Sequence, residues 1–126
     1  MKIKRIRLTN IGPYINDNDF EFDLSDNTRR IVLIGGKNGA GKTTLFTAIK
    51  TCLYGCIAYG FATPNSKYFA EIESIINATE KLKKVGEARI IVDLVLDDGK
   101  YDSIYTFSRK WKIAGKKIAE TFDVLK

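Results

Sequence analysis

The sequence predicts an α/β fold, in which a central strand, a glycine-rich loop and a helix are flanked by antiparallel strands. The apolar run at residues 30–34 is rich in β-branched residues and ends at two glycines, as a buried strand does. Apolar residues at helical spacing follow these glycines and stop at Gly55, which predicts a helix. The last third of the chain follows a strand-like period, and its Asp98-Gly99 pair favours a tight hairpin.

Two antiparallel strands are expected before the buried strand. Residues 3–11 carry apolar residues in a broken alternation, and residues 20–24 alternate cleanly. The stretch NIGPYINDND, residues 10–19, is rich in Gly, Pro, Asn and Asp, so it predicts a loop or turn. Acidic residues alternate about the phenylalanines here, which indicates a solvated strand face rather than a metal site. They are Asp17, Asp19, Glu21 and Asp23.

Two helices and a three-stranded meander are predicted after the glycine-rich loop. The apolar side of the first helix consists of Leu45, Phe46, Ala48, Ile49, Cys52 and Leu53. A second amphipathic helix is expected over residues 66–84, with Leu82 on its apolar side and Gly86 at its end. The strands are expected at residues 88–96, 101–107 and 118–125, with a second turn at Ala114-Gly115.

Composition bounds the class of protein. The 126 residues fit one compact domain, and no apolar stretch approaches the roughly 18 residues of a membrane span. The N-terminus lacks the apolar core of a signal peptide, so a cytoplasmic protein is expected. A net charge of +6 favours an anionic partner, either nucleotide or nucleic acid. No histidine accompanies Cys52 and Cys56, which are expected to be reduced packing residues.

A phosphate-binding loop is predicted directly after the buried strand. Residues 36–43 have the sequence GKNGAGKT, which fits the pattern G-x-x-x-x-G-K-[ST]. Glycines let backbone N–H groups curl around a phosphate, Lys42 supplies a charge for the β- and γ-phosphates, and Thr43 supplies a hydroxyl for Mg²⁺. The predicted nucleotide-binding residues are Gly36, Lys37, Asn38, Gly39, Ala40, Gly41, Lys42, Thr43 and Thr44. A turn that merely joined strand to helix would not explain Lys42-Thr43, so ATP and Mg²⁺ are the expected ligands.

ATP hydrolysis also needs an acidic residue for Mg²⁺ and a group that orients water. Asp93 and Asp97 follow apolar runs, but Asp93 lies inside its predicted strand and Asp98 belongs to a turn. We therefore interpret these acids as structural. The chain contains no glutamine and no LSGG-type segment. A full-length protein is expected to be an ATPase, whereas this fragment is expected to bind nucleotide without turning it over.

Several strings resemble the N-terminal part of the SMC-like ATPases, the group that includes RecF and RecN. They are MKIKRIRLTNIGPY at residues 1–14, FEFDL at residues 20–24 and IVLIGGKNGAGKTTLFTAIKTCLYG at residues 31–55. In that family a coiled coil separates two lobes of the ATPase head, and heads pair around ATP. The resemblance implies that residues 1–126 are the first lobe of a longer protein, which pairs head to head with complete protomers.

Within this group, four strings are similar to DndD, the family of ATPases in bacterial DNA phosphorothioation. They are RLTNIGPY at residues 7–14, IGGKNGAGKTTLF at residues 34–46, LYG at residues 53–55 and especially TPNSKYF at residues 63–69. This resemblance implies DNA sulfur modification as the process, with a cysteine desulfurase and sulfur-transfer proteins as partners. The alternative in the same group is a double-strand-break repair or recombination ATPase. Two other classes stay open. One is the ATP-binding domain of a transporter, although the usual PGE turn is missing, and the other is a basic DNA-binding module with a vestigial loop.

Basic residues gather in the last predicted hairpin. Residues 109–117 contain no acidic residue and include Trp111. Their basic residues are Arg109, Lys110, Lys112, Lys116 and Lys117. A second basic group consists of Lys2, Lys4, Arg5 and Arg7. Such clusters contact DNA phosphates by releasing counterions. The competing interpretation is that edge-strand lysines prevent strand pairing and that Trp111 belongs to the core.

Overall fold

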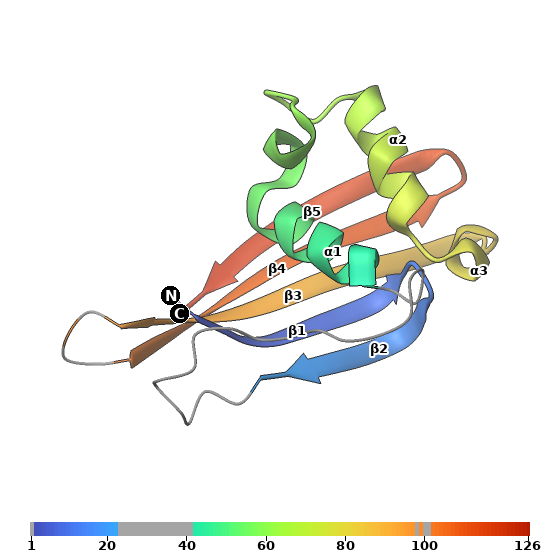
Figure 1. Ribbon diagram of the computed structural model, residues 1–126. Helices are drawn as coiled ribbons and strands as arrows, with labels where there is room; N and C mark the ends of the chain where they lie inside the picture. Colours follow the sequence, from blue (N-terminus) through green and yellow to red (C-terminus); the bar gives the residue numbers. More distant parts are fainter. Residues whose placement is uncertain (1, 23–41, 98, 100–101) are drawn as a thin grey trace.

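The computed structural model describes residues 2–22, 42–97, 99 and 102–126. They form a five-stranded antiparallel sheet in the order β2-β1-β3-β4-β5, with the helices on one of its faces (Figure 1). The strands are β1 (Lys2–Ile11), β2 (Tyr14–Glu21), β3 (Val85–Asp97), β4 (Asp102–Ala114) and β5 (Lys117–Leu125). The helices are α1 (Lys42–Tyr54), the 3₁₀ helix η1 (Gly55–Tyr59), α2 (Ser66–Ile75) and α3 (Ala78–Lys81). The broader prediction, an α/β fold with flanking antiparallel strands, is confirmed, while the expected strand at residues 30–34 lies outside the described residues.

The first helix and the meander agree with the sequence predictions. α1 ends directly before Gly55, whose φ of +57° is one that side chains disfavour, so the helix stops there. β3, β4 and β5 pair in sequence order, and Gly99 and Gly115 take positive φ at the turns. β4 continues beyond the expected residue 107 because Trp111 and Ile113 extend its buried face.

The loop predicted at residues 10–19 is wrong. β2 already begins at Tyr14, so only Gly12 and Pro13 separate it from β1. The polar residues belong to a strand because one face of the sheet carries no helix, and on that face Asp19 can pair with Arg7. Turn-type residues are also present, since Asn10 and Asn16 adopt φ values of 56° and 58°.

The single helix predicted over residues 66–84 is also wrong. α2 ends at Ile75, and the extended backbone of Ile76 separates it from α3. Asn77 explains the break, because its Nδ2 donates to the carbonyl of Gly12 at 2.7 Å while its Oδ1 accepts from the Thr79 amide and caps α3. Leu82 is 87% exposed instead of facing the core. Gly86 lies within β3 rather than ending a helix.

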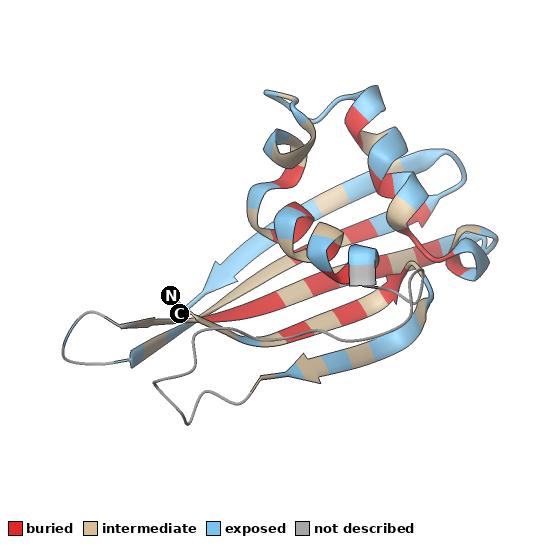
Figure 2. Cartoon of the chain, in the orientation of Figure 1, coloured by how far each residue is buried: buried red, intermediate tan, exposed pale blue. Residues whose placement is uncertain are grey.

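The hydrophobic core fills the space between the sheet and the helices (Figure 2). Alternate residues of the three central strands point toward the helices and are buried, because strand side chains alternate between faces. They are Ile6, Leu8, Ala88, Ile90, Val92, Leu94, Trp111 and Ile113. From the helices, Leu45, Ala48 and Cys52 of α1 and Tyr68 and Ile72 of α2 meet them. Among the described helices, none is long and apolar enough to cross a membrane.

Candidate functional site

The predicted phosphate-binding loop leads directly into α1. Lys42 is the first residue of this helix, whereas Gly36, Lys37, Asn38, Gly39, Ala40 and Gly41 lie outside the described residues, as does the Lys42 side chain. α1 has no acidic residue in its first turn. The partial positive charge of its N-terminal end is therefore not offset by a carboxylate of that turn, which suits a phosphate ligand.

Thr43 and Thr44 occupy different environments in the first turn of α1. Thr43 is exposed, so its hydroxyl is accessible to a ligand or an ion. Thr44 is half-buried and packs against Gly12 in the β1–β2 turn. A Cβ at Gly12 would lie 2.9 Å from Thr44 Cγ2, and Gly12 has a φ of +52°. Only glycine therefore allows this turn to approach the helix without strain.

Hydrogen bonds hold the β1–β2 turn in this position. The Gly12 amide donates to the carbonyl of Ile75 at 2.7 Å. Asn77 Nδ2 donates to the Gly12 carbonyl at 2.7 Å, and Asn10 Nδ2 donates to the carbonyl of Glu87 at 2.9 Å. The turn is thus fixed between α1, the end of α2 and β3.

A pocket of about 210 Å³ lies between this turn and the two helices. Four hydroxyl-bearing residues, Thr43, Thr44, Thr47 and Ser74, line it together with Ile11, Gly12, Ala48 and Ile75. Hydroxyls can donate and accept hydrogen bonds, so a polar ligand beside the start of α1 would find partners here. The sequence alone did not indicate Gly12, Thr47 or Ser74, because their positions depend on contacts between distant segments.

The other end of α1 is closed by a buried arginine. Arg109 Nε donates to the Cys52 carbonyl at 3.1 Å, and the guanidinium stacks 4.0 Å from the Phe122 ring centroid. Gly55 makes room for it, since a Cβ there would lie 2.9 Å from Arg109 Nη1. A cation at the carbonyl end of a helix is favourable, so Arg109 stabilises this terminus.

Glu120 accepts hydrogen bonds from three buried donors. Trp111 Nε1 donates at 2.7 Å, Arg109 Nη1 donates at 3.2 Å, and the Tyr68 hydroxyl donates to the same carboxylate. Burial and the adjacent Glu120 raise the pKa of Tyr68 above its usual range, so the hydroxyl keeps its proton. Arg109, one of the residues predicted to contact DNA, is only 8% exposed, and its guanidinium is bound within the core. Trp111 is a core residue as well.

The other residues predicted to contact DNA differ in their exposure and pairing. Lys110 is half-buried and pairs with Glu87, Nζ to Oε1, at 3.3 Å. Lys112, Lys116 and Lys117 are exposed and stay candidates for contact with an anion.

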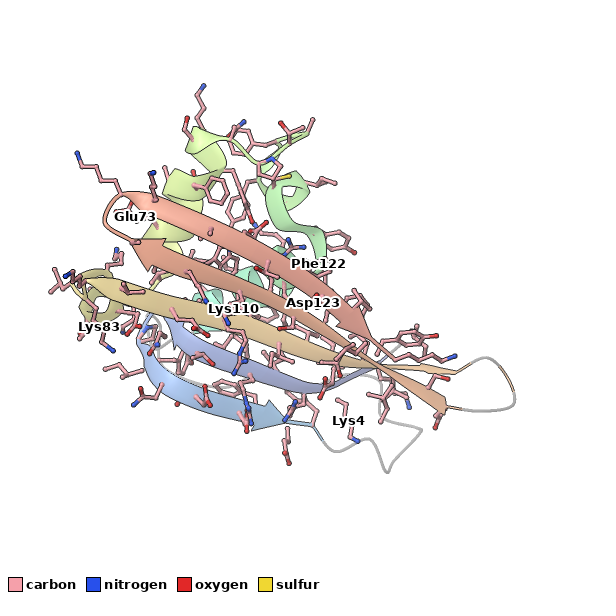
Figure 3. All side chains as sticks on the ribbon, turned by 180° about the vertical axis from the view of Figure 1, so that it is seen from behind. Lys4, Glu73, Lys83, Lys110, Phe122 and Asp123 are labelled. Carbon is pink, nitrogen blue, oxygen red and sulfur yellow. The ribbon has the colours of Figure 1, made fainter. Side chains whose placement is uncertain are left out.

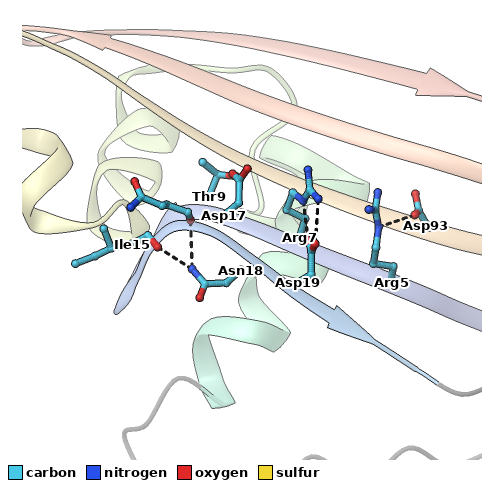
Figure 4. Close-up of polar contacts among 9 residues, drawn as sticks. Arg5, Arg7, Thr9, Ile15, Asp17, Asn18, Asp19 and Asp93 are labelled. Carbon is cyan, nitrogen blue, oxygen red and sulfur yellow. Dashed lines mark hydrogen bonds and ion pairs between the residues drawn. The ribbon is translucent and has the colours of Figure 1, made fainter.

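Asp93 is structural, as predicted. It lies within β3, where its carboxylate accepts from Arg5 Nε at 2.9 Å (Figure 4). The same carboxylate accepts from the Thr106 hydroxyl at 2.7 Å. The side chain of Asp97 and the whole of Asp98 lie outside the described residues.

The acidic residues of β2 lie on the sheet face without helices, as the predicted solvated strand face requires. Asp19 accepts from Arg7 Nε at 2.6 Å, and Asp17 accepts from the Thr9 hydroxyl at 2.6 Å (Figure 4). The hydrogen bond from Arg7 lowers the pKa of Asp19. Within the described part of the chain, no group of three or more His, Cys, Asp or Glu side chains could hold a metal ion.

Both cysteines are free, and Cys52 has the predicted packing role. Its thiol lies 3.4 Å from the carbonyl oxygens of Ile90 and Phe107, to which it donates. Burial raises the pKa of Cys52 to about 12. The thiol is therefore protonated and unreactive at neutral pH.

An α/β lobe whose helix follows a phosphate-loop sequence has the features of a P-loop ATPase domain. The chain belongs to the AAA domain family, whose model matches residues 5–125.

Curated relatives are named as the C subunit of the nuclease SbcCD. The protein of Treponema pallidum is 36% identical over 84 residues, which cover 58% of this chain and 8% of the relative. The protein of Staphylococcus saprophyticus is 40% identical over 55 residues, covering 44% of this chain and 5% of the relative. This chain therefore spans less than a tenth of the length of the relatives it matches. These similarities support the broader prediction of an SMC-like P-loop ATPase head, whereas the narrower prediction of DndD lacks support.

Proposed function

We propose that this chain is the ATP-binding lobe of an SMC-like ATPase that acts in DNA repair or recombination. The observation that carries the proposal is the first turn of α1, which starts at the lysine of the phosphate-loop sequence, exposes Thr43 and contains no acid. The similarity to proteins named as part of a nuclease favours repair over DNA sulfur modification.

The proposed ligand is ATP with Mg²⁺. Backbone amides of residues 36–41 would surround the phosphates, Lys42 would contact the β- and γ-phosphates, and Thr43 would bind the metal ion. Thr44 packs against Gly12, so it would position the first turn of α1 rather than contact the ligand. Bound Mg²⁺ would neutralise charge on the phosphates during hydrolysis.

The proposal extends to the full-length protein. Hydrolysis would require residues beyond this lobe, since Asp93 is engaged by Arg5 and Thr106. Two heads would pair around ATP, and the protein would act on DNA together with a separate nuclease component, as the name of its relatives suggests.

The test is MgATP binding and hydrolysis by the full-length protein. Lys42→Ala should abolish both, because the loop loses its point charge for the phosphates. Lys50→Ala, an exposed position farther along the same helix, is the matched control and should leave both unchanged. Retention of nucleotide affinity in Lys42→Ala would contradict the proposal and favour a vestigial loop.

DNA phosphorothioation is the second candidate, supported only by the similarity of short strings to DndD, above all TPNSKYF at residues 63–69. Helix capping and core packing explain two residues of TPNSKYF without reference to DndD. The Asn65 side chain accepts from the Tyr68 amide at 2.9 Å and caps α2, while Tyr68 is a core residue. Mass spectrometry of digested genomic DNA decides between the candidates. Loss of phosphorothioate linkages on deletion of the gene, restored by the intact gene but not by Lys42→Ala, would favour sulfur modification.

A further inference from the structure

A buried asparagine ties two distant segments together beside the proposed nucleotide site. Asn77 is 8% exposed and lies between α2 and α3. Its Nδ2 donates to the carbonyl of Gly12 at 2.7 Å, and its backbone amide donates to the carbonyl of Asn10 at 2.9 Å. Its Oδ1 accepts from the Thr79 amide at 2.9 Å and so caps α3. Two of these three bonds therefore reach the β1–β2 turn rather than the helix that Asn77 caps.

The backbone before Asn77 runs alongside the end of β1. Ile76 forms an isolated antiparallel bridge with Ile11, and the Ile75 carbonyl accepts from the Gly12 amide at 2.7 Å. These contacts fix the distance between the β1–β2 turn and the end of α2. The position of the turn therefore depends on the junction between α2 and α3.

The β1–β2 turn, α3 and the start of α1 lie toward the same end of the sheet (Figure 1). Figure 3, which shows the molecule from behind, labels Glu73 and Lys83 at this end, and Asn77 lies between these two residues in the chain. The pocket that the described residues form beside Thr43 is lined by Gly12 and not by Asn77. Asn77 is therefore close to the proposed nucleotide site without being part of the surface that would contact the ligand.

The end of β1 needs this support because its backbone is left-handed at two positions. Asn10 has a φ of 56° and Gly12 has a φ of 52°. The left-handed conformation is uncommon for residues with a Cβ, and it persists where surrounding contacts hold it. Asn77 donates to the carbonyls of both residues, from its amide to Asn10 and from its side chain to Gly12. One residue thus holds the turn at both left-handed positions.

The position of the β1–β2 turn is transmitted to α1 through a close contact. A Cβ at Gly12 would lie 2.9 Å from Thr44 Cγ2, so the turn packs directly against the first turn of the helix. Close-packed groups move together, because a gap between them would lose van der Waals contacts. Thr44 directly follows Lys42 and Thr43, the proposed phosphate and Mg²⁺ residues. A shift of the β1–β2 turn would therefore displace the first turn of α1, where these residues lie.

We propose that Asn77 is a positioning residue for MgATP, which holds the first turn of α1 in its binding orientation through Gly12 and Thr44. The inference rests on the proposed function and adds a residue that acts on the site without touching the ligand. An amide side chain suits this role, because Nδ2 donates to Gly12 while Oδ1 accepts from Thr79. A serine at this position would keep the cap of α3, but its shorter side chain would lose the bond to Gly12.

Asn65 provides the matched control. Its Oδ1 accepts from the Tyr68 amide at 2.9 Å and caps α2, as Asn77 caps α3. Asn65 is exposed, and within the described part of the chain its side chain makes no hydrogen bond to a distant segment. The same substitution at the two positions therefore separates the long-range bond from helix capping.

The experiment measures the equilibrium Kd of the full-length protein for MgATP, at a temperature at which every variant is folded. Asn77→Ser should raise the Kd by about two- to tenfold, the range expected when one hydrogen bond is lost from the binding orientation. Asn65→Ser should leave the Kd unchanged. The combined variant Gly12→Ala, Asn77→Ser tests the route through the turn, because Gly12→Ala displaces Thr44 directly. In that background Asn77→Ser should raise the Kd by a smaller factor than it does alone.

Hydrogen exchange of the wild-type protein supplies a measurement that needs no variant. MgATP should slow exchange of the amides of Gly12 and Asn77, whose hydrogen bonds join the turn to the junction. The physical reason is that the ligand and the junction stabilise the same arrangement, so each strengthens the other. The Tyr68 amide, which is bonded to Asn65, is the control and should exchange at an unchanged rate. This measurement decides the question if Asn77→Ser does not fold.

Four results would overturn the inference: an unchanged Kd in Asn77→Ser, an equal rise in Asn65→Ser, effects of Gly12→Ala and Asn77→Ser that simply multiply, or exchange at the junction that MgATP does not slow. A lower melting temperature of Asn77→Ser with an unchanged Kd would assign this residue to stability alone. A wild-type protein that does not bind MgATP would contradict the proposed function and the positioning role together. Binding that Lys42→Ala abolishes but Asn77→Ser leaves intact would contradict the positioning role only.

Discussion

The two ends of α1 meet the rest of the molecule in opposite ways. At the N-terminal end, Gly12 brings a turn close to Thr44, and the exposed Thr43 lines a pocket together with other hydroxyl-bearing residues. At the C-terminal end, Arg109 and Glu120 satisfy each other's charges in the core. In our proposal one end of the helix binds a ligand, whereas the contacts at the other end stabilise the fold.

Glycines at the two ends have similar geometry but different surroundings. Both have positive φ, and in both a Cβ would meet a side-chain atom at 2.9 Å. At Gly12 the obstructing atom belongs to Thr44 in the predicted nucleotide site, whereas at Gly55 it belongs to the buried Arg109. Substitutions at matched positions can therefore separate function from stability.

The largest expected effect is a loss of stability caused by a substitution at the C-terminal end of α1. Glu120→Ala should lower the free energy of unfolding by about 3–5 kcal/mol, because it leaves Arg109 charged and unpaired in the core and removes the acceptor of two other donors. Thermal unfolding of the full-length protein measures the change. Asp123→Ala on the same strand, where the side chain is exposed, should cost little. Similar melting temperatures of the two variants would contradict the stabilising role of the ion pair between Arg109 and Glu120.

The paired glycine substitutions should give intermediate effects. Gly12→Ala and Gly55→Ala should each cost about 1–2 kcal/mol from strain at positive φ. Only Gly12→Ala should weaken MgATP binding, because it displaces Thr44 in the first turn of α1. Gly60→Ala, at a φ of +84° with nothing within 4 Å, is the control for strain alone. Equal losses of MgATP affinity at Gly12 and Gly55 would remove the functional distinction between the ends.

The smallest expected effect concerns Cys52 at the closed end. Burial raises its pKa to about 12, so the folded state keeps a proton that the unfolded chain loses at lower pH. The contribution to stability is complete below the unfolded pKa of about 8.5 and is lost as the pH rises from there toward 12. Cys52→Ala should weaken this loss of stability in alkaline solution, as followed by urea unfolding. At neutral pH, the half-buried Cys56 should react with iodoacetamide before Cys52.

The sequence pattern predicted those elements whose form depends on residues within one segment of the chain. α1 and the hairpin turns could be predicted, since helical spacing, stop glycines and the Asp98-Gly99 pair act through neighbouring residues. The structural role of Asp93 could also be predicted from its place within an apolar run. β2 was missed because polar residues on an open sheet face have the composition of a loop.

The sequence by itself determined the α/β class, the helix after the phosphate-loop pattern and the excess of positive charge. Only the tertiary structure decided that Arg109 belongs to the core, that Gly12 adjoins Thr44 and that the lysine-rich residues 80–87 and 110–117 meet at one end of the sheet. The physical reason is that backbone propensity acts between residues close in the chain. Burial, ion pairing and the gathering of like charges depend on strand register and packing between segments that the sequence separates.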